Sequence, residues 1–128
     1  MTRLSHRQLQ LTGRLAHAWS ADDPRAMMRV LAPRVSLTID HGGTPFGREL
    51  EHASGSVRVA SSLRRLLRSR PTMTLSELWA NGRPAIAMVE IDRIIGIVSV
   101  DIRRCRIVRV WIVTNPAKLN GWNTRHRT

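Results

Sequence analysis

Hydrophobic residues in the first third of the chain recur at the spacing of a helix. The stripe consists of Leu4, Leu11, Leu15 and the Ala18-Trp19 pair. Residues three, four or seven positions apart share one face of a helix, so this pattern predicts an amphipathic helix that reaches Trp19. Asp22-Asp23-Pro24 then offers an N-cap and a first-turn proline for a second, shorter helix, which Pro33 ends.

A second apolar stripe predicts a helix in the middle of the chain. It consists of Val59, Ala60, Leu63, Leu66 and Leu67. We expect Ser54 or Ser56 to cap this helix, because a serine hydroxyl accepts a hydrogen bond from the free backbone N–H groups of the first turn. The helix should run to about Ser69, and Pro71 stops it.

Alternating apolar and polar residues replace the helical spacing elsewhere. The segment from Val35 to Asp40 alternates strictly and predicts a half-buried strand. His41-Gly42-Gly43 breaks this strand, and we expect a loop from there to Ser54. Further strands are predicted over residues 73–80, 85–91, 94–102 and 106–113, with Asn81-Gly82 as a hairpin turn between the first two.

The predicted elements follow the order ααβαββββ, which indicates an α+β fold. Its strands form a curved, mostly antiparallel sheet, and the three N-terminal helices are available to cover the apolar face. A curved sheet wrapped around helices tends to leave a pocket, so this architecture favours small-molecule binding. No repeat is visible, and we expect one domain over residues 1–122 followed by a basic tail at 123–128.

Composition excludes several kinds of site. A chain of 128 residues with 42% hydrophobic residues can bury its own core. The single cysteine, Cys105, excludes an intramolecular disulfide and a cysteine-based zinc site. No metal-ligand spacing, glycine-rich phosphate loop or nucleophile motif is present, so we expect neither metal nor cofactor. Because no signal peptide or membrane-length apolar run is visible, we expect a cytoplasmic protein without a membrane partner.

The charge of the chain is strongly positive. It has 21 Lys and Arg residues against 9 Asp and Glu, a formal charge of +12, and Lys118 is the only lysine. Such an excess attracts nucleic acid, anionic ligands or an acidic protein surface. A solvated, arginine-rich surface that reflects a GC-rich genome explains it as well. With four Trp, one Phe and no Tyr, few side chains are available to stack on bases, so nucleic acid is the weakest of these candidate partners.

Four motifs, in order along the chain, resemble one known family. Residues 21–35 contain Ala-Asp-Asp and Leu-Ala-Pro-Arg-Val, and residues 40–43 read Asp-His-Gly-Gly. Residues 81–84 read Asn-Gly-Arg-Pro, and residues 115–119 read Asn-Pro-Ala-Lys-Leu. Together with the element order, they resemble the SnoaL-like and nuclear transport factor 2 superfamily. The closest resemblance is to the C-terminal domain of sigma-J-type extracytoplasmic function sigma factors, over residues 7–122.

This resemblance implies a cone-shaped fold and a set of partners. In the sigma factors the domain is a regulatory appendage that contacts the core sigma regions through two of these motifs. These two motifs are the ones at residues 40–43 and 115–119. Here His41 replaces a glycine of the motif at 40–43, and Ala117 replaces an acidic residue of the motif at 115–119. The promoter-binding helical regions are not in this sequence, so we expect a freestanding relative of the appendage. The resemblance also implies a homodimer that pairs through the outer face of the sheet.

Four acidic residues are candidates for acid/base catalysis: Asp40, Glu77, Glu90 and Asp101. Asp40 closes a strand, and the other three share a strand face with apolar residues. A carboxylate held in an apolar cavity has a raised pKa and can serve as general acid or base. Superfamily members that isomerise, cyclise or open epoxides use such groups. Alternatively, these carboxylates point outward to arginines, and Asp40 caps the Gly-Gly turn.

Ligand-binding candidates are mostly aromatic. Trp19, Trp79 and Trp111 are predicted to line a pocket or to fill the core, since each has a large flat ring and one N–H donor. Arg109 lies beside Trp111 on one strand face and is a candidate polar contact. His17, and His52 with it, are candidates for a proton relay or are surface histidines.

The sequence therefore leaves competing functions open. The first is a small-molecule-binding protein, or a regulatory module that contacts a sigma factor or polymerase. The second is a small cofactor-independent enzyme, an isomerase, cyclase or epoxide hydrolase acting on an apolar or polyketide-like substrate. A third, weaker hypothesis is electrostatic binding of nucleic acid through the arginines of the third helix.

Overall fold

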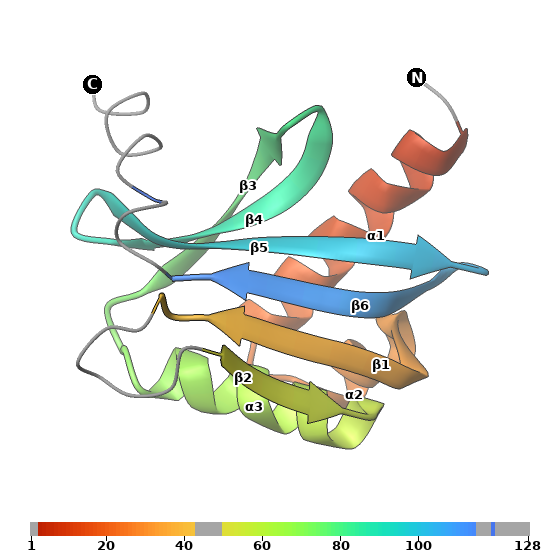
Figure 1. Ribbon diagram of the computed structural model, residues 1–128, viewed down its shortest axis with the longest axis horizontal. Helices are drawn as coiled ribbons and strands as arrows, with labels where there is room; N and C mark the ends of the chain where they lie inside the picture. Colours follow the sequence, from red (N-terminus) through yellow and green to blue (C-terminus); the bar gives the residue numbers. More distant parts are fainter. Residues whose placement is uncertain (1–2, 43–49, 115–118, 120–128) are drawn as a thin grey trace.

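Three helices and six strands make up the computed structural model, which describes residues 3–42, 50–114 and 119 (Figure 1). The helices are α1 (Arg3–Ser20), α2 (Pro24–Val30) and α3 (Ser56–Arg68). The strands are β1 (Leu31–Asp40), β2 (Leu50–Ser54), β3 (Thr74–Ala80), β4 (Arg83–Glu90), β5 (Arg93–Arg103) and β6 (Arg106–Val113). The predicted α+β class and the order ααβαββββ are confirmed, with one short strand, β2, added before α3.

All six strands join one sheet in the order β2-β1-β6-β5-β4-β3. Every neighbouring pair is antiparallel except β1 and β6, which run parallel and place Asp40 beside Val113. The last four strands form an antiparallel meander, and the β3–β4 hairpin curls away from the plane of the other strands (Figure 1). The sheet is therefore curved and mostly antiparallel, as the sequence indicated.

Local signals explain most of the element ends. Asp23 caps α2 by accepting a hydrogen bond from the Ala26 N–H at 3.2 Å, and Pro24 opens the helix as predicted. The helix ends at Val30, before Pro33, and β1 begins directly at Leu31. At Asn81 and Gly82 the φ angles are +54° and +76°, which is the left-handed geometry of the predicted hairpin turn.

Two local predictions were wrong. The stretch expected to be a loop up to Ser54 contains β2, an edge strand whose residues pair with β1 from Ser36 to Asp40. The N-cap of α3 is Gly55 rather than Ser54 or Ser56, and no side chain caps this helix. The Gly55 N–H instead donates to the Val35 carbonyl oxygen at 2.8 Å, so pairing with β1 fixes the start of α3.

The helices cover one face of the sheet, which we call the inner face, with a continuous apolar core. Its largest fully buried side chains come from all three helices and from the strands, and include Trp19, Leu15, Met27, Leu63, Ile86, Met88 and Ile112. A second cluster lies on the opposite, outer face, where Leu119 packs with Ala80, Ala85, Ala87, Ile94 and Ile97. Within the described ranges, no helix is long and apolar enough to span a membrane. The Asn115–Lys118 part of the last motif and the predicted tail at 123–128 lie outside the described residues.

Candidate functional site

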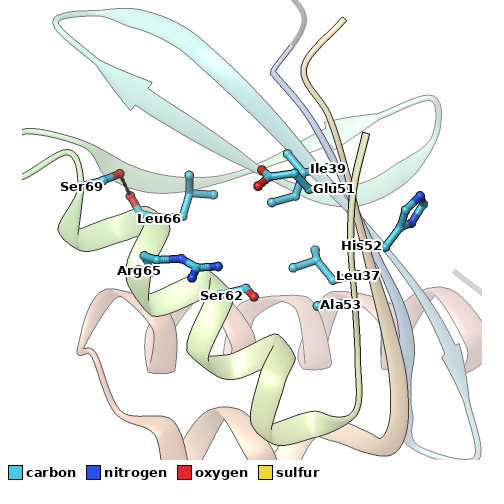
Figure 2. Close-up of a pocket in the computed structure, with 9 residues that line it drawn as sticks. All are labelled: Leu37, Ile39, Glu51, His52, Ala53, Ser62, Arg65, Leu66 and Ser69. Carbon is cyan, nitrogen blue, oxygen red and sulfur yellow. Dashed lines mark hydrogen bonds between the residues drawn. The ribbon is translucent and has the colours of Figure 1, made fainter. Parts of the chain in front are cut away.

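A pocket of about 200 Å³ opens between α3 and the β1–β2 edge of the inner face (Figure 2). Its apolar surface comes from Leu37 and Ile39 on β1, Ala53 on β2 and Leu66 on α3. Ser62 and Ser69 add hydroxyl groups from α3, although the Ser69 hydroxyl already donates to the Leu66 carbonyl oxygen at 2.7 Å. The site thus combines an apolar floor with polar groups at one side.

Two opposite charges face this pocket from different elements. Arg65 extends from α3 and Glu51 from β2 towards the space between them (Figure 2). The carboxylate of Glu51 also contacts His41, whose Nε2 lies 2.6 Å from Oε2. On its other side, His41 Nδ1 lies 2.7 Å from the Thr114 hydroxyl oxygen. A hydrogen-bonded chain therefore runs from Thr114 through His41 to Glu51 at the pocket.

The strand register explains why these side chains meet. Glu51 pairs with Ile39 across β1 and β2, so both point to the inner face, whereas His52 pairs with Thr38 and points to the outer face. Figure 2 shows His52 directed away from the pocket, and its Nδ1 lies 3.2 Å from the Thr38 hydroxyl oxygen. His41 follows the last residue of β1 and is two residues beyond Ile39. Its side chain therefore points to the same inner face as Ile39 and reaches Glu51.

His52, a predicted relay candidate, does belong to the lining, although its side chain turns away to Thr38, whereas the charged lining residues Arg65 and Glu51 and the adjoining His41 were not predicted site residues. Arg65 was considered only as one of the arginines of the third helix that could attract nucleic acid, and Glu51 fell in the expected loop. His41 was noted only as a departure from the Asp-Gly-Gly-Gly pattern. That departure was the available signal, because a histidine in place of a glycine brings a new titratable group to the end of a strand.

The four predicted catalytic acids lie at separate places. Asp40 is buried and its Oδ1 accepts a hydrogen bond from the Gly42 N–H at 2.9 Å, which is the turn-capping role that the sequence offered as an alternative. Asp101 lies on the outer face, 3.6 Å from Arg83 and 3.8 Å from Arg109. Neither lines the pocket beside α3.

The other two acids lie on or near the inner face but away from the pocket. Glu90 accepts a hydrogen bond from Arg70 at 3.0 Å and another from the Thr72 hydroxyl at 3.2 Å. Glu77 is exposed on β3 and its carboxylate rests against α1 at Gly13. The structure does not bring the four acids together, and their catalytic roles stay predictions.

The predicted ligand-binding residues are also dispersed. Trp19 is fully buried in the core, and its Nε1–H donates to the Leu63 carbonyl oxygen at 2.7 Å. Trp79 is 50% exposed on β3 and Trp111 is 40% exposed on the outer face of β6. His17 is exposed on α1, and Arg109 lies on the outer face beside Asp101. Their roles in ligand binding stay predictions.

One ion-pair cluster helps to hold α3, which we call the roof of the pocket, in place. The Asp22 carboxylate accepts hydrogen bonds from Arg64 Nε at 2.7 Å and from Arg68 Nη2 at 2.8 Å. These two guanidinium groups, Arg64 first, lower the pKa of Asp22 below its ordinary value of 3.8. The cluster ties the turn between α1 and α2 to α3. Among the residues that the structure describes, no three His, Cys, Asp or Glu side chains are grouped as metal ligands.

Comparison with solved structures shows the fold. The extracytoplasmic function sigma factor SigJ of Mycobacterium tuberculosis is similar with a TM-score of 0.67 and 20% identity, over 90% of this chain and 44% of that one. A SnoaL-like protein of unknown function from Burkholderia thailandensis is similar with a TM-score of 0.60 and 18% identity, over 87% and 94% of the two chains. An LEH-like epoxide hydrolase of M. tuberculosis is similar with a TM-score of 0.53 and 12% identity, over 95% and 92%.

These similarities agree with the resemblance seen in the sequence. The chain has the SnoaL-like, nuclear transport factor 2-like fold, and it spans less than half of the sigma factor that it matches. No protein-family model matches the sequence, and no curated protein matches it. At these identities the solved structures show the fold alone, so the function has to be argued from the site.

Proposed function

We propose that this protein binds a small molecule in the pocket between α3 and the β1–β2 edge. One observation carries the proposal: an apolar floor and a pair of opposite charges, Arg65 and Glu51, line the same cavity. Binding sites for small molecules commonly have this composition, with apolar walls for affinity and a few polar groups for orientation. Leu37, Ile39 and Leu66 would contact the apolar body of the ligand.

The size of the cavity restricts the ligand. A volume of about 200 Å³ equals the space of roughly seven water molecules, at about 30 Å³ each. It suits a single substituted ring rather than a multi-ring compound. Arg65 favours a carboxylate or hydroxyl head group on that ring, because its guanidinium offers several donors in one plane. The charge of Glu51 is balanced by His41 when that imidazole is protonated.

Three related probes test the proposal: benzoate, benzyl alcohol and benzylamine. Each is titrated into the ¹⁵N-labelled protein while amide chemical shifts are recorded. We expect saturable shifts at residues 37–39, 51–53 and 62–69, with dissociation constants on the order of 1 mM, and benzoate binding more tightly than benzylamine. Failure of all three probes to saturate, or shifts confined to other regions, would contradict the proposal.

Two serines of α3 supply a matched pair of variants. Ser62 lines the pocket and its neighbour Ser61 is exposed. Ser62→Leu should fill the cavity and abolish the shifts, whereas Ser61→Leu should leave them unchanged. Equal binding by both variants would place the probes elsewhere. Arg65→Gln, with exposed Arg58→Gln as its control, should weaken benzoate more than benzyl alcohol.

A regulatory role is the finer form of this proposal, and similarity to part of a sigma factor supports it. Ligand binding beside α3 would then alter contact with a sigma factor or polymerase. Co-purification of the tagged full chain with its host's sigma factors and core polymerase tests this form. Retention of a sigma factor or polymerase supports it, and absence of both counts against it.

The hydrogen-bonded chain from Thr114 to Glu51 supports a second candidate, an acid/base enzyme of the isomerase, cyclase or epoxide hydrolase kind. A carboxylate oriented by a histidine, at the edge of an apolar cavity, is suited to remove a proton next to a carbonyl group. Exchange of the α-protons of cyclohexanone in D₂O, followed by NMR, measures such a base directly. The protein should accelerate exchange above the buffer rate, and Glu51→Gln should remove the acceleration. A wild-type rate equal to buffer would contradict catalysis at this pair.

A further inference from the structure

A second depression, of about 550 Å³, lies mainly on the outer face of the sheet, where Ser36, Asp101 and Arg109 pair across neighbouring strands. We call it the arginine groove. Its lining residues come from α1 and from four adjacent strands: Gln8, Ala32, Arg34, Ser36, Arg83, Asp101, Ile102, Arg103, Val108 and Arg109. Four of these ten residues are arginines and one is acidic. The groove is therefore a concentrated part of the positive charge of the chain.

Strand order places these charges in a row. Arg34 lies on β1, Arg109 on β6, Asp101 on β5 and Arg83 on β4, and these four strands are consecutive neighbours in the sheet. Neighbouring strands are about 4.8 Å apart, so the row extends across roughly 14 Å. Such a row is long enough to contact several charges of an extended partner.

The arginines of the groove are only loosely neutralised. Asp101 is the one carboxylate of the lining, and its contacts with Arg83 and Arg109 measure 3.6 and 3.8 Å, longer than hydrogen bonds. Arg83 and Arg109 are 60% and 59% exposed. Within the described part of the chain, neither Arg34 nor Arg103 has a recorded ion pair or hydrogen bond. These guanidinium groups are available to carboxylates from another molecule.

We propose that the arginine groove docks an acidic polypeptide segment that carries Asp or Glu side chains among aliphatic ones. Charge complementarity requires an anionic occupant, and a guanidinium binds a carboxylate through two parallel hydrogen bonds. The aliphatic lining residues, Ala32, Ile102 and Val108, provide an apolar floor for the aliphatic side chains of the segment. This interaction is separate from ligand binding beside α3.

Two other occupants fit less well. Single-stranded nucleic acid is usually held by stacking of its bases on aromatic rings, and none of the lining residues is aromatic. A second copy, related by two-fold symmetry, would place the arginines of one groove against those of the other, which repel. Both occupants remain outcomes of the experiment below.

The probe is a fluorescein-labelled peptide that repeats Asp-Leu-Glu-Ala, titrated with the full chain and followed by fluorescence anisotropy. Its amide counterpart, which repeats Asn-Leu-Gln-Ala, controls for charge. We expect saturable binding of the acidic peptide that weakens as salt is raised, and little binding of the amide peptide. In wild-type protein, amide shifts on adding the peptide should map to β1, β5 and β6 around the groove.

Two triple variants with the same net charge locate the binding. The groove variant carries Arg34→Gln, Arg103→Gln and Arg109→Gln, and the control variant carries Arg14→Gln, Arg25→Gln and Arg58→Gln on exposed helix positions. The groove variant should lose about tenfold in affinity or more, and the control about twofold or less. Circular dichroism verifies that both are folded, and the single variant Arg103→Gln replaces the triple if it is not.

Three results would overturn the proposal. Equal weakening in both variants would mean that net charge alone attracts the peptide. Tighter binding of oligo-dT than of the acidic peptide, lost in the groove variant, would assign the groove to nucleic acid. A dimer detected by light scattering that dissociates only in the groove variant would assign it to a second copy.

Discussion

The two ends of the inner face differ in how closely they are packed. The end under α1 is tight: between the paired strands β4 and β5, a methyl group added at Gly96 would lie 2.6 Å from the Met88 sulfur. One built at Gly13 of α1 would lie 3.0 Å from the Glu77 carboxylate. Under α3, by contrast, a pocket of about 200 Å³ separates the helix from β1 and β2.

This difference shows where a cone-shaped fold can hold a ligand in this sequence. Trp19 lies between the two ends and joins them, since it leaves the C-terminal part of α1 and donates to the carbonyl oxygen of Leu63 in α3. The centre of the inner face is filled by this ring and its buried neighbours, so the open volume is displaced to the α3 edge. The predictions below test the tight end, the junction and the attachment of α3.

The largest effects on stability are expected at Met88, which is 1% exposed and lies opposite Gly96 on the neighbouring strand. Met88→Ala should lower the free energy of unfolding by about 2–5 kcal/mol, since it leaves a cavity in the core. Gly96→Ala should lower it by about 1–3 kcal/mol, because the added methyl group forces Met88 from its place. Urea unfolding measures both losses.

The double variant distinguishes close packing from two separate defects. If the Met88 side chain and a methyl group at position 96 compete for the same space, Met88→Ala/Gly96→Ala should lose less than the sum of the single losses. If the two losses in unfolding free energy add exactly, the Met88 side chain and the methyl group at position 96 do not compete, and this end is packed less closely than the contact indicates.

At the junction, Trp19→Phe removes the indole N–H and part of the ring. We expect a loss of about 1–3 kcal/mol in unfolding free energy, from the hydrogen bond and the smaller buried volume. Hydrogen exchange should also become faster in α3, because Trp19 connects that helix to α1. The control is Trp79→Phe, which removes the same atoms at a half-exposed position and should stay within about 0.5 kcal/mol of wild type. Similar losses of unfolding free energy in Trp19→Phe and Trp79→Phe would show that Trp19 does not connect α1 to α3 in this way.

Sequence reasoning found the elements of the tight end because their signals are local. The stripe of α1, the Asn81-Gly82 turn and the alternation in the last strands each depend on residues close together in the chain. The strand β2 has no such signal, because four of its five residues are exposed and it forms only by pairing with β1. An edge strand of this kind depends on partners that periodicity does not identify.

The candidate site was harder to predict for the same reason. Glu51 reaches the pocket only because it pairs opposite Ile39, and His41 meets Thr114 only because β1 and β6 run parallel. Alternation showed that Asp101 shares a face with other residues, but not that this face is the outer one. Its arginine partners come from β4 and β6. Register and the choice of covered face are properties of the assembled sheet.

A smaller effect is expected where Glu77 rests against α1. Gly13→Ala should raise the free energy of unfolding by about 0.5–1 kcal/mol, because alanine favours the helix and the exposed carboxylate can turn towards water. Thermal and urea unfolding measure the gain. If Glu77 is instead held in place, Gly13→Ala will destabilise the protein, and adding Glu77→Ala will restore the gain. That outcome would mark this carboxylate as fixed, as a catalytic role would require.

The smallest effect concerns the attachment of α3 through Asp22, whose carboxylate lies on the surface. Asp22→Asn keeps a residue suited to the left-handed backbone at this position, where φ is +54°, and removes the charge and one of the two oxygens that accept from the arginines. The pKa of Asp22 is lowered in the folded protein, so its ion pairs stabilise the fold above the ordinary carboxylate pKa and lose this effect as the pH falls through the lowered value. The variant should therefore unfold at a slightly lower temperature than wild type at pH 7. The difference in unfolding temperature should narrow below about pH 4 and shrink in high salt.

Asp23→Asn, at a neighbouring cap that asparagine also serves, is the control and should show little of this pH dependence. A difference between Asp22→Asn and wild type that persists unchanged at low pH would mean that backbone geometry, and not the two arginines, connects this turn to the roof of the pocket.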